Sequence, residues 1–517
     1  MTTPSPHQKN TPKLGNVYLI GAGPGDPGLL TLRGKQLLAG AEVILYDYLA
    51  NPKLLDHCSE KAQKICLGSH SAGRLWTQDQ INQAMIEYAG QGLRVARLKG
   101  GDPSIFGCGF QELDALDTAG VRFEVVPGVS SGIAAAAYAG IPITHRDTAS
   151  AVAFVTGQES RLKPDSIHEL PALARFPGTL VIYMGTTTVE RWSGGLIQYG
   201  KAKETPVAIV RRCTHADQSV ILTTLGEVTQ RVRTDPPMRP PVVFVVGEVA
   251  KLSPRFNWFA QRPLFGKTIL VTRPEAQADD LALPLRELGA EVLCEPAIEI
   301  SPVASTDSLH ELLRQKNQFD WLVFSSSNGV REFIHQLRAT GSDLRWLATS
   351  RIAAIGPGTA AELQNYHLDA DLIPETFNAE GLLEQLTSEA KDQNFLLLRA
   401  SRGREILAEG LLQAGGKVTQ AVIYESVDRP QAPPEILERM NSDEIHWVTV
   451  TSSAIAKSTH QLYGTALRKT KIASISPLTS SVHHDLGYQV DAEAVEATMP
   501  SMIQAIHDAE RSRASDV

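Results

Sequence analysis

Short runs of β-branched and apolar residues alternate with amphipathic helical patterns along much of this 517-residue chain. Near the start, VYLIGAG (17–23), EVILYDYL (42–49) and LRVARLK (93–99) are typical of strands, and a helical pattern separates each from the next. Parallel strands require such crossovers, so the alternation predicts an α/β fold with largely parallel sheets. At about 150 residues per domain, we expect three or four domains.

Glycine-rich loops follow three of the predicted strands in the first part of the chain. They are GAGPGDPG (21–28), GGDP (100–103) and PGVSSG (127–132). The carboxyl ends of parallel strands lie at one edge of a sheet, where α/β proteins bind ligands. We therefore expect a small-molecule site that is built from the backbones of these loops.

The first loop also satisfies the G-x-G-x-x-G pattern of dinucleotide-binding sites, and Asp47 lies roughly 20 residues further on. Pro24 and Pro27 argue against a dinucleotide, because proline lacks the N–H group that a pyrophosphate would need. The loop favours another small-molecule cofactor with little negative charge. A purely structural turn and an NAD-dependent oxidoreductase remain the alternatives.

Composition and charge exclude several classes of protein. No apolar run is long enough to span a membrane, and the N-terminus lacks the apolar core of a signal peptide, so we expect a cytoplasmic protein without membrane contact. Five scattered cysteines without C-x-x-C spacing argue against disulfides and a zinc site, and no metal is expected. A net charge of −8 gives no basic signature for nucleic acid.

Changes in composition and in apolar pattern along the sequence indicate how the chain is divided. Residues 1–13 are rich in Pro, Ser and Thr and are expected to be a disordered tail. The pattern changes near 251–266, so we place a first unit over 14–253, a linker over 254–265 and a second unit over 266–517.

The second unit contains an internal repeat. Arg273 matches Arg399, and WLVFSSSNGV (321–330) matches WVTVTSSAIA (447–456), at one separation of 126 residues. The repeat predicts two similar α/β domains, in tandem or intertwined. Chance is the alternative, because any two strand–helix units share apolar periodicity.

Between about 15 and 250 the sequence resembles the tetrapyrrole methyltransferases, and more narrowly the uroporphyrinogen-III C-methyltransferases. The matching stretches, in order, are VYLIGAGPGDPGLLTLRG, VILYDYL, LKGGDPSIFGCG, VVPGVSSGIAAAAYAGIPITHRD, FVTGQ, TLVIYMG and TPVAIV. The resemblance implies a fold of two α/β subdomains, S-adenosylmethionine as cofactor and two methylations of uroporphyrinogen III that give precorrin-2. It also implies a homodimer formed through this half.

The same resemblance implies a set of site residues. Asp47 matches the carboxylate that is regarded as the general base, since a methylated pyrrole carbon must lose a proton. A helix N-cap is the alternative for Asp47, a turn residue for Asp102, and apolar packing for Met184. The cofactor contacts fall on Pro24, Gly100, Gly101, Asp102, Ile105, Ser130, Ser131, Met184 and Cys213.

The chain departs from that family's pattern at two places. Ser69 stands where related enzymes usually have a lysine, which leaves the detailed proton transfer open. Arg211-Arg212-Cys213-Thr214 replaces the usual E-N-G-T. Arg211 and Arg212 would supply positive charge for substrate carboxylates.

Residues from about 266 to 510 resemble uroporphyrinogen-III synthase through VTRP, FSSSNGV, AIGPGTA, GLLQAGGKVTQAVIYES, VTVTSS and SISPLTSS. The resemblance implies two α/β domains joined by a two-stranded linker, with the substrate in the cleft. Subdomain A would comprise 266–300 and 428–517, and subdomain B 302–426. The implied reaction closes linear hydroxymethylbilane to uroporphyrinogen III with inversion of the last ring.

Tyr424 matches the tyrosine that is suspected in that family as the acid for hydroxyl loss, with packing in the linker as the alternative. Donors from both domains are expected to bind the substrate's carboxylates. Each hydroxyl is equally suited to cap a helix, and each arginine to lie in solvent. The candidates are Arg273, Ser326, Ser327, Arg399, Thr451, Ser452, Ser476 and Thr479.

The whole chain is therefore expected to be a bifunctional enzyme of tetrapyrrole synthesis that acts on small-molecule tetrapyrrole substrates. The alternative is a methyltransferase for another corrin intermediate, joined to a noncatalytic synthase-like binding module.

Overall fold

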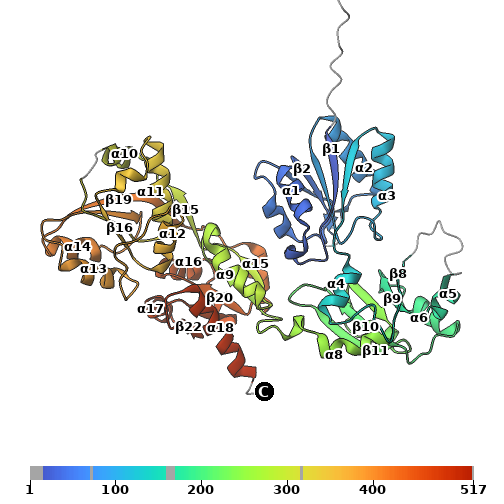
Figure 1. Cartoon of the computed structure of the whole chain (residues 1–517). Helices are drawn as coiled ribbons and strands as arrows, with labels where there is room; N and C mark the ends of the chain where they lie inside the picture. Colours follow the sequence, from blue (N-terminus) through green and yellow to red (C-terminus); the bar gives the residue numbers. More distant parts are fainter. Residues whose placement is uncertain (1–14, 70–73, 159–168, 315–317, 515–517) are drawn as a thin grey trace, which may run out of the picture. The chain divides into compact units, whose positions relative to one another are not determined.

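The computed structural model describes residues 15–69, 74–158, 169–314 and 318–514 (Figure 1). The expected tail, 1–13, lies outside these ranges. The chain divides into two compact units, residues 1–266 and 267–517, and each is described by itself. Four five-stranded sheets with flanking helices confirm the predicted α/β class. No helix in the described ranges combines the length and apolarity that crossing a bilayer requires.

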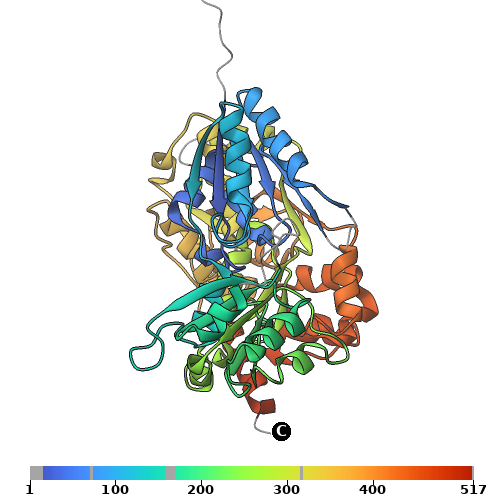
Figure 2. The same cartoon turned by 90° about the vertical axis from the view of Figure 1, so that its right-hand side faces the viewer.

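The first lobe of unit 1 is a parallel sheet with the strand order β3-β2-β6-β1-β7. Successive residues of its strands point to opposite faces, so Leu19 packs under α2 and α3, whereas Ile20 packs under α1. Figure 2 shows α2 and α3 in front of the sheet. The elements are β1 (Asn16–Gly21), α1 (Leu32–Gly40), β2 (Val43–Tyr46), β3 (Gln63–Cys66), α2 (Gln78–Gly90), β6 (Val95–Lys99), α3 (Gly109–Thr118) and β7 (Arg122–Val126).

The second lobe of unit 1 is a mixed sheet with the order β11-β10-β12-β9-β8, in which only β8 and β9 run parallel. Apolar clusters cover both faces, one beneath α4 and the other beneath α6 and α7. The elements are α4 (Ser131–Tyr138), β8 (Val152–Thr156), α5 (Glu169–Arg175), β9 (Thr179–Tyr183), α6 (Val189–Gln198), β10 (Pro206–Arg211), β11 (Ser219–Thr224), α7 (Val228–Val232) and β12 (Val242–Val246).

Residues 254–265, which we expected to form a linker, pack onto unit 1. Phe259 and Leu264 are buried. The rings of Trp258 and Phe259 lie 5.2 and 4.8 Å from the ring of Tyr138, centroid to centroid. Burial of these apolar side chains favours packing over an extended connection. The segment, which begins within α8 (Ser253–Phe256), is therefore packed onto unit 1 through Phe259 and Leu264.

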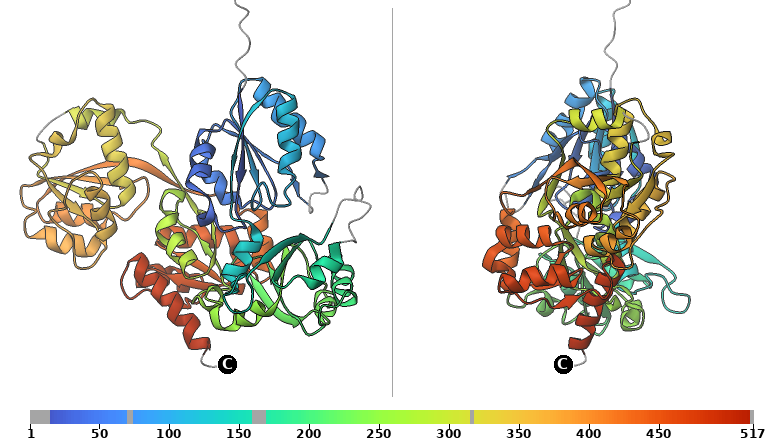
Figure 3. Two further views of the ribbon diagram at one scale, coloured as in Figure 1. Left: turned by 45° about the vertical axis from the view of Figure 1, so that its right-hand side comes forward. Right: turned by 90° about the vertical axis from the view of Figure 1, so that its left-hand side faces the viewer.

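The two sheets of unit 2 share one strand arrangement, as the internal repeat predicts. Lobe A has the parallel order β14-β13-β20-β21-β22, and lobe B has the order β15-β19-β18-β16-β17. At the repeat's separation, β14, β13 and β20 correspond to β19, β18 and β16, and these three strands are neighbours in the same order in both sheets, with β15 as an additional edge strand in lobe B. The chain enters lobe B through β15 and leaves it through β19, which pair antiparallel (Figure 3). The two similar domains are therefore intertwined.

The helices and strands of unit 2 are divided between the two lobes according to the sheet that they form or cover. Lobe A contains β13 (Thr268–Val271), α9 (Glu275–Glu287), β14 (Glu291–Cys294), α15 (Pro434–Asn441), β20 (Trp447–Val450), α16 (Ser453–Tyr463), β21 (Lys471–Ser474), α17 (Pro477–Asp485), β22 (Ala492–Glu493) and α18 (Met499–Ala514). Lobe B contains β15 (Ile298–Pro302), α10 (Asp307–Arg314), β16 (Trp321–Phe324), α11 (Ser327–Ala339), β17 (Arg351–Ala354), α12 (Pro357–Gln364), α13 (Ala379–Thr387), β18 (Asn394–Ala400), α14 (Ile406–Gln413) and β19 (Lys417–Asp428).

Candidate active sites

The three glycine-rich loops of unit 1 meet at the carboxyl ends of β1, β6 and β7. Gly23 and Gly101 form an isolated antiparallel bridge, in which the Gly101 N–H donates to the Gly23 carbonyl at 2.8 Å. A Cβ on Gly128 would lie 2.2 Å from the Gly101 carbonyl oxygen and 2.7 Å from Gly21 Cα. Only glycine permits this approach, so the loop backbones form one continuous surface.

The first loop does not form a pyrophosphate cradle. Asp26 accepts a 2.8 Å hydrogen bond from the Gly28 N–H and a 2.7 Å hydrogen bond from the Tyr138 hydroxyl. Helix α1 begins only at Leu32, beyond the glycines. A pyrophosphate site places the helix N-terminus at the glycine loop, so the dinucleotide pattern is met here in spacing alone.

Asp102 ties two of the loops together. Its Oδ2 accepts from the Gly128 N–H at 2.9 Å, and its Oδ1 accepts from the Ser104 N–H at 2.8 Å. The second bond makes Asp102 a turn residue, the alternative that the sequence left open. Of the other predicted cofactor residues of the first lobe, Gly100, Gly101 and Ile105 lie on the loop after β6, and Pro24 lies on the loop after β1.

The remaining predicted cofactor residues lie on loops that approach from the second lobe or border it. The Ser130 hydroxyl lies 2.7 Å from the Tyr183 hydroxyl, and the Cys213 thiol lies 3.8 Å from the Ser131 carbonyl oxygen. Burial raises the pKa of the Cys213 thiol to about 12, so this group stays protonated at neutral pH. Met184 has a φ of 52° and is about half exposed. The two contacts of Ser130 and Ser131 bring the segment after β7 together with the end of β9 and the loop after β10.

Asp47, which follows β2, is joined to a buried charged cluster. Its Oδ1 lies 2.7 Å from Arg97 Nη2, and its Oδ2 accepts from the Gly100 N–H at 3.2 Å. Arg97 and Lys99 of β6 are each 2% exposed and lie 3.1 and 2.7 Å from Glu112 of α3. Buried charges require such partners, and the two cations balance the two carboxylates. Asp47 is thus an ion-paired, partly exposed carboxylate and caps no helix.

Arg97, Lys99 and Glu112 are functional candidates that were not predicted from the sequence. One sequence pattern could have indicated Arg97 and Lys99: they alternate with apolar residues in VARLK. The structure shows that all residues of this strand are buried. Burial and the neighbouring charge of Arg97 lower the pKa of Lys99. No comparable pattern in the sequence indicates Glu112, which is far from these residues along the chain.

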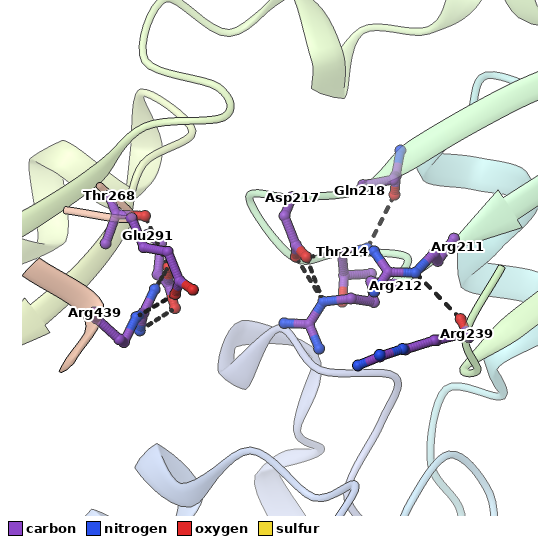
Figure 4. A network of polar contacts seen from close by, with 10 residues as sticks. Arg211, Arg212, Thr214, Asp217, Gln218, Arg239, Thr268, Glu291 and Arg439 are labelled. Atoms are coloured by element: carbon purple, nitrogen blue, oxygen red, sulfur yellow. Dashed lines mark hydrogen bonds and ion pairs between the residues drawn. The ribbon is translucent and has the colours of Figure 1, made fainter. Parts of the chain in front are cut away.

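The two departures from the methyltransferase pattern lie on different loops. Arg212 Nε donates to Asp217 at 2.8 Å, and Arg211 Nε donates to the Arg239 carbonyl at 3.2 Å (Figure 4). The positive charge that we expected to face the substrate is therefore partly paired within unit 1. Ser69 ends the short strand β4 (Gly68–Ser69), and residues 70–73 lie outside the described ranges.

Unit 2 contains a cavity of about 260 Å³. Its wall is formed by the ends of β13 and β20, the loops after β16 and β18, and part of β15 and β19. Both lobes thus contribute to it. Five of the predicted residues line it: Arg273, Ser326, Tyr424, Thr451 and Ser452.

Tyr424 contributes a phenol hydroxyl to the wall of this cavity. Its hydroxyl lies 2.9 Å from the hydroxyl of Ser326, which also caps α11 by accepting from the Gly329 N–H at 3.0 Å. Burial raises the pKa of the Tyr424 phenol, against smaller opposing effects of the Ser326 bond and the Arg402 charge. The phenol therefore remains protonated at neutral pH and can donate a proton.

The other four predicted substrate residues lie outside the wall of the cavity. The Ser327 hydroxyl donates to the Gly358 carbonyl at 3.1 Å, and Arg399 pairs with Glu405. Ser476 caps α17 by accepting from the N–H of Thr479, and the Thr479 side chain is buried. Ser476 thus caps a helix, and Arg399 forms an ion pair away from the cavity wall. Arg402 also lines the cavity and was not predicted from the sequence.

Within the described ranges, no group of three or more His, Cys, Asp or Glu side chains is placed to hold a metal ion. All five cysteines are free.

Two family models match separate parts of the chain. Residues 16–229 match the model described as Tetrapyrrole (Corrin/Porphyrin) Methylases, and residues 279–504 match Uroporphyrinogen-III synthase HemD.

Individual relatives span both parts. The Porphyrin biosynthesis protein HemD of Ruminiclostridium josui is 34% identical over 446 residues, which are 85% of this chain and 87% of that protein. The Uroporphyrinogen-III C-methyltransferase of Bacillus subtilis (strain 168) is 40% identical over 352 residues, 68% of this chain and 72% of that protein. A solved uroporphyrin-III C-methyl transferase from Thermus thermophilus, complexed with S-adenyl homocysteine, is 36% identical, covering 46% of this chain and 99% of its own, with a TM-score of 0.40.

Proposed function

This chain belongs to the tetrapyrrole methylases through its first half and to the uroporphyrinogen-III synthases through its second, and from that premise we propose how its two sites work. It is a bifunctional enzyme of tetrapyrrole biosynthesis, with uroporphyrinogen-III synthase and S-adenosylmethionine-dependent uroporphyrinogen-III C-methyltransferase activities. We propose that unit 2 closes hydroxymethylbilane to uroporphyrinogen III, and that unit 1 methylates this product twice to precorrin-2.

We propose that the converging loops of unit 1 hold the cofactor through the nine residues named above. Backbone N–H and C=O groups, the hydroxyls of Ser130 and Ser131, and the carboxylate of Asp102 can bind an adenine, a ribose and an amino-acid group. The first glycine loop places no helix N-terminus at its glycines, because α1 begins only at Leu32, and this fits a cofactor without a pyrophosphate. When bound, S-adenosylmethionine supplies an electrophilic methyl group.

Asp47 is the proposed general base. The pyrrole carbon that has formed the new bond to methyl must lose its proton, and a carboxylate is a suitable acceptor. The observation that carries this assignment is the 3.2 Å bond from the Gly100 N–H, because it places Asp47 directly beside a proposed cofactor loop. Arg97 orients the other carboxylate oxygen, and the side chain is 31% exposed, so a substrate can reach it.

In unit 2, Tyr424 is the proposed acid. Its protonated phenol would donate to the departing hydroxyl of hydroxymethylbilane, which leaves a reactive azafulvene. Ser326 orients the phenol, and Thr451 and Ser452 approach from lobe A. Binding groups from both lobes would hold the flexible chain in one closing geometry, which accounts for much of the catalysis expected here.

The cofactor assignment predicts that Gly128→Ala weakens the binding of S-adenosylhomocysteine by on the order of ten-fold or more, because the new Cβ must displace the Gly101 carbonyl. Isothermal titration calorimetry measures this. Gly90→Ala is the matched control, since a Cβ there meets nothing within 4 Å. Equal affinities for the wild type and Gly128→Ala, or tight binding of NAD by the wild type, would contradict the assignment.

We also propose that the enzyme works in the cytoplasm and forms a homodimer through unit 1. Free cysteines support a reducing compartment.

The molar mass of the purified protein in solution tests the dimer.

A further inference from the structure

Arg402 lies on the loop after β18 and is anchored to β19. Its Nη1 lies 2.6 Å from Asp428, and its Nε donates to the Ser426 hydroxyl at 3.0 Å. The planar guanidinium is therefore held in a fixed orientation, because both of these partners belong to one strand. The third nitrogen, Nη2, is buried and has no hydrogen-bond partner among the described residues.

Arg273 of lobe A also has a buried guanidinium nitrogen without a hydrogen-bond partner among the described residues. Its side chain is 12% exposed, and its Nη2 donates to Gln277 at 3.2 Å. Its Nη1 is buried without a hydrogen-bond partner among the described residues, and Asp280 at 3.6 Å is too distant for a hydrogen bond. Buried donors are nearly always satisfied, so two unsatisfied guanidinium nitrogens in one cavity point to an anionic ligand.

The cavity wall supports this ligand class. Among the described residues that line it, the only charged side chains are those of Arg273 and Arg402. The wall also contains Ile298, Ile300 and Ile455, which suit the faces of pyrrole rings. Tyr424 lies on the same wall, and the charge of Arg402 acts to lower the pKa of its phenol.

We propose that Arg402, together with Arg273, binds a carboxylate group of the substrate and so positions the linear tetrapyrrole against Tyr424. The inference rests on the proposed synthase function of unit 2. Arg402 supplies Nη2 as a charge-assisted donor, while Asp428 and Ser426 hold the remainder of the guanidinium in place. Arg402 is thus a substrate-positioning residue, and the proton is transferred by Tyr424.

Steady-state kinetics on the full-length enzyme tests the proposal, with hydroxymethylbilane as substrate and uroporphyrinogen III as the measured product. Arg402→Gln is expected to raise KM by about ten-fold or more with a smaller effect on kcat, because a charge-assisted hydrogen bond to substrate is lost. Arg402→Lys is expected to recover part of the affinity. The KM of Arg402→Gln is also expected to depend less steeply on salt than that of the wild type.

Two further variants separate binding from a structural role. Arg404→Gln is the matched control, since Arg404 lies two residues away and pairs with Glu380 outside the cavity; its KM is expected to match that of the wild type. Asp428→Asn weakens the anchor of the guanidinium but keeps its charge and its free nitrogen, so its KM is expected to rise by clearly less than that of Arg402→Gln.

A KM for Arg402→Gln that equals the wild-type value would overturn the proposal. So would an equal rise of KM in Asp428→Asn, because the ion pair and not the free nitrogen would then be responsible. If the wild type formed only the type I isomer, the synthase function itself would be wrong, and this outcome is distinct from both.

Discussion

Asp47→Asn is expected to lower the rate of methylation by about 10²-fold or more, the usual contribution of a general base. Asparagine keeps the shape of the side chain and a partner for the Gly100 N–H, but it cannot accept the proton from the methylated carbon. The measurement supplies uroporphyrinogen III and S-adenosylmethionine and follows precorrin-2 by absorbance. Ring closure in unit 2 is expected to remain at the wild-type rate.

Glu124→Gln is the control for this variant. Glu124 is a carboxylate of the same lobe that pairs with Arg33 in solvent, at 2.7 Å, and its loss is expected to leave methylation unchanged. Because Asp47→Asn also removes a partner of the buried Arg97, thermal unfolding should be measured alongside activity. A folded Asp47→Asn protein that binds S-adenosylhomocysteine and methylates at half the wild-type rate would exclude Asp47 as the base.

Tyr424→Phe is expected to lower the rate of ring closure to uroporphyrinogen III by about 10²-fold, since the proton for the departing hydroxyl is lost. The type I isomer that forms without the enzyme should then dominate the products. Methylation of supplied uroporphyrinogen III should be unaffected. The ordinary pKa of a tyrosine phenol is about 10, and burial raises that of Tyr424. Deprotonation of this acid should therefore not lower the wild-type rate until the pH is above about 10.

Tyr488→Phe gives a matched control, because the Tyr488 hydroxyl donates to the Gly464 carbonyl at 2.9 Å outside the wall of the cavity. It removes a tyrosine hydroxyl from the same unit and should retain ring closure. An unchanged rate and isomer ratio in Tyr424→Phe would remove the phenol from the mechanism.

Most of the fold was predictable because hydrophobic periodicity is local. The alternation of strands and helices indicated parallel sheets, and the 126-residue repeat indicated two similar domains in the second half. The crossing through β15 and β19 was implied only by the family resemblance. The repeat could not reveal it, because an antiparallel pair between 298–302 and 424–428 depends on contacts far apart in the chain. The packing of 254–265 was missed for the same reason.

The candidate sites were predictable where backbone geometry demands a residue type. The glycine loops of unit 1 are such a case, since their close approach excludes any side chain. The cluster of Arg97, Lys99 and Glu112 was missed, because the partners come from separate elements and only the fold brings them together.

Arg273 and Arg399 show the limit of reasoning from the repeat. They occupy equivalent sequence positions, but only Arg273 lines the cavity. The register between β18 and β19 shifts between Arg399 and Ala400, whereas β13 pairs with β14 without a shift. Such an irregularity re-aims the residues around it, and Arg402 is the arginine that reaches the cavity from lobe B.

One chain carries both activities, and the product of unit 2 is the substrate of unit 1. The most direct test supplies the purified enzyme with hydroxymethylbilane, with and without S-adenosylmethionine, and identifies the tetrapyrroles by mass and isomer analysis. We predict uroporphyrinogen III without the cofactor and precorrin-2 with it. The type I isomer alone without cofactor would contradict the synthase assignment, and the absence of methylated product with cofactor would contradict the methyltransferase assignment.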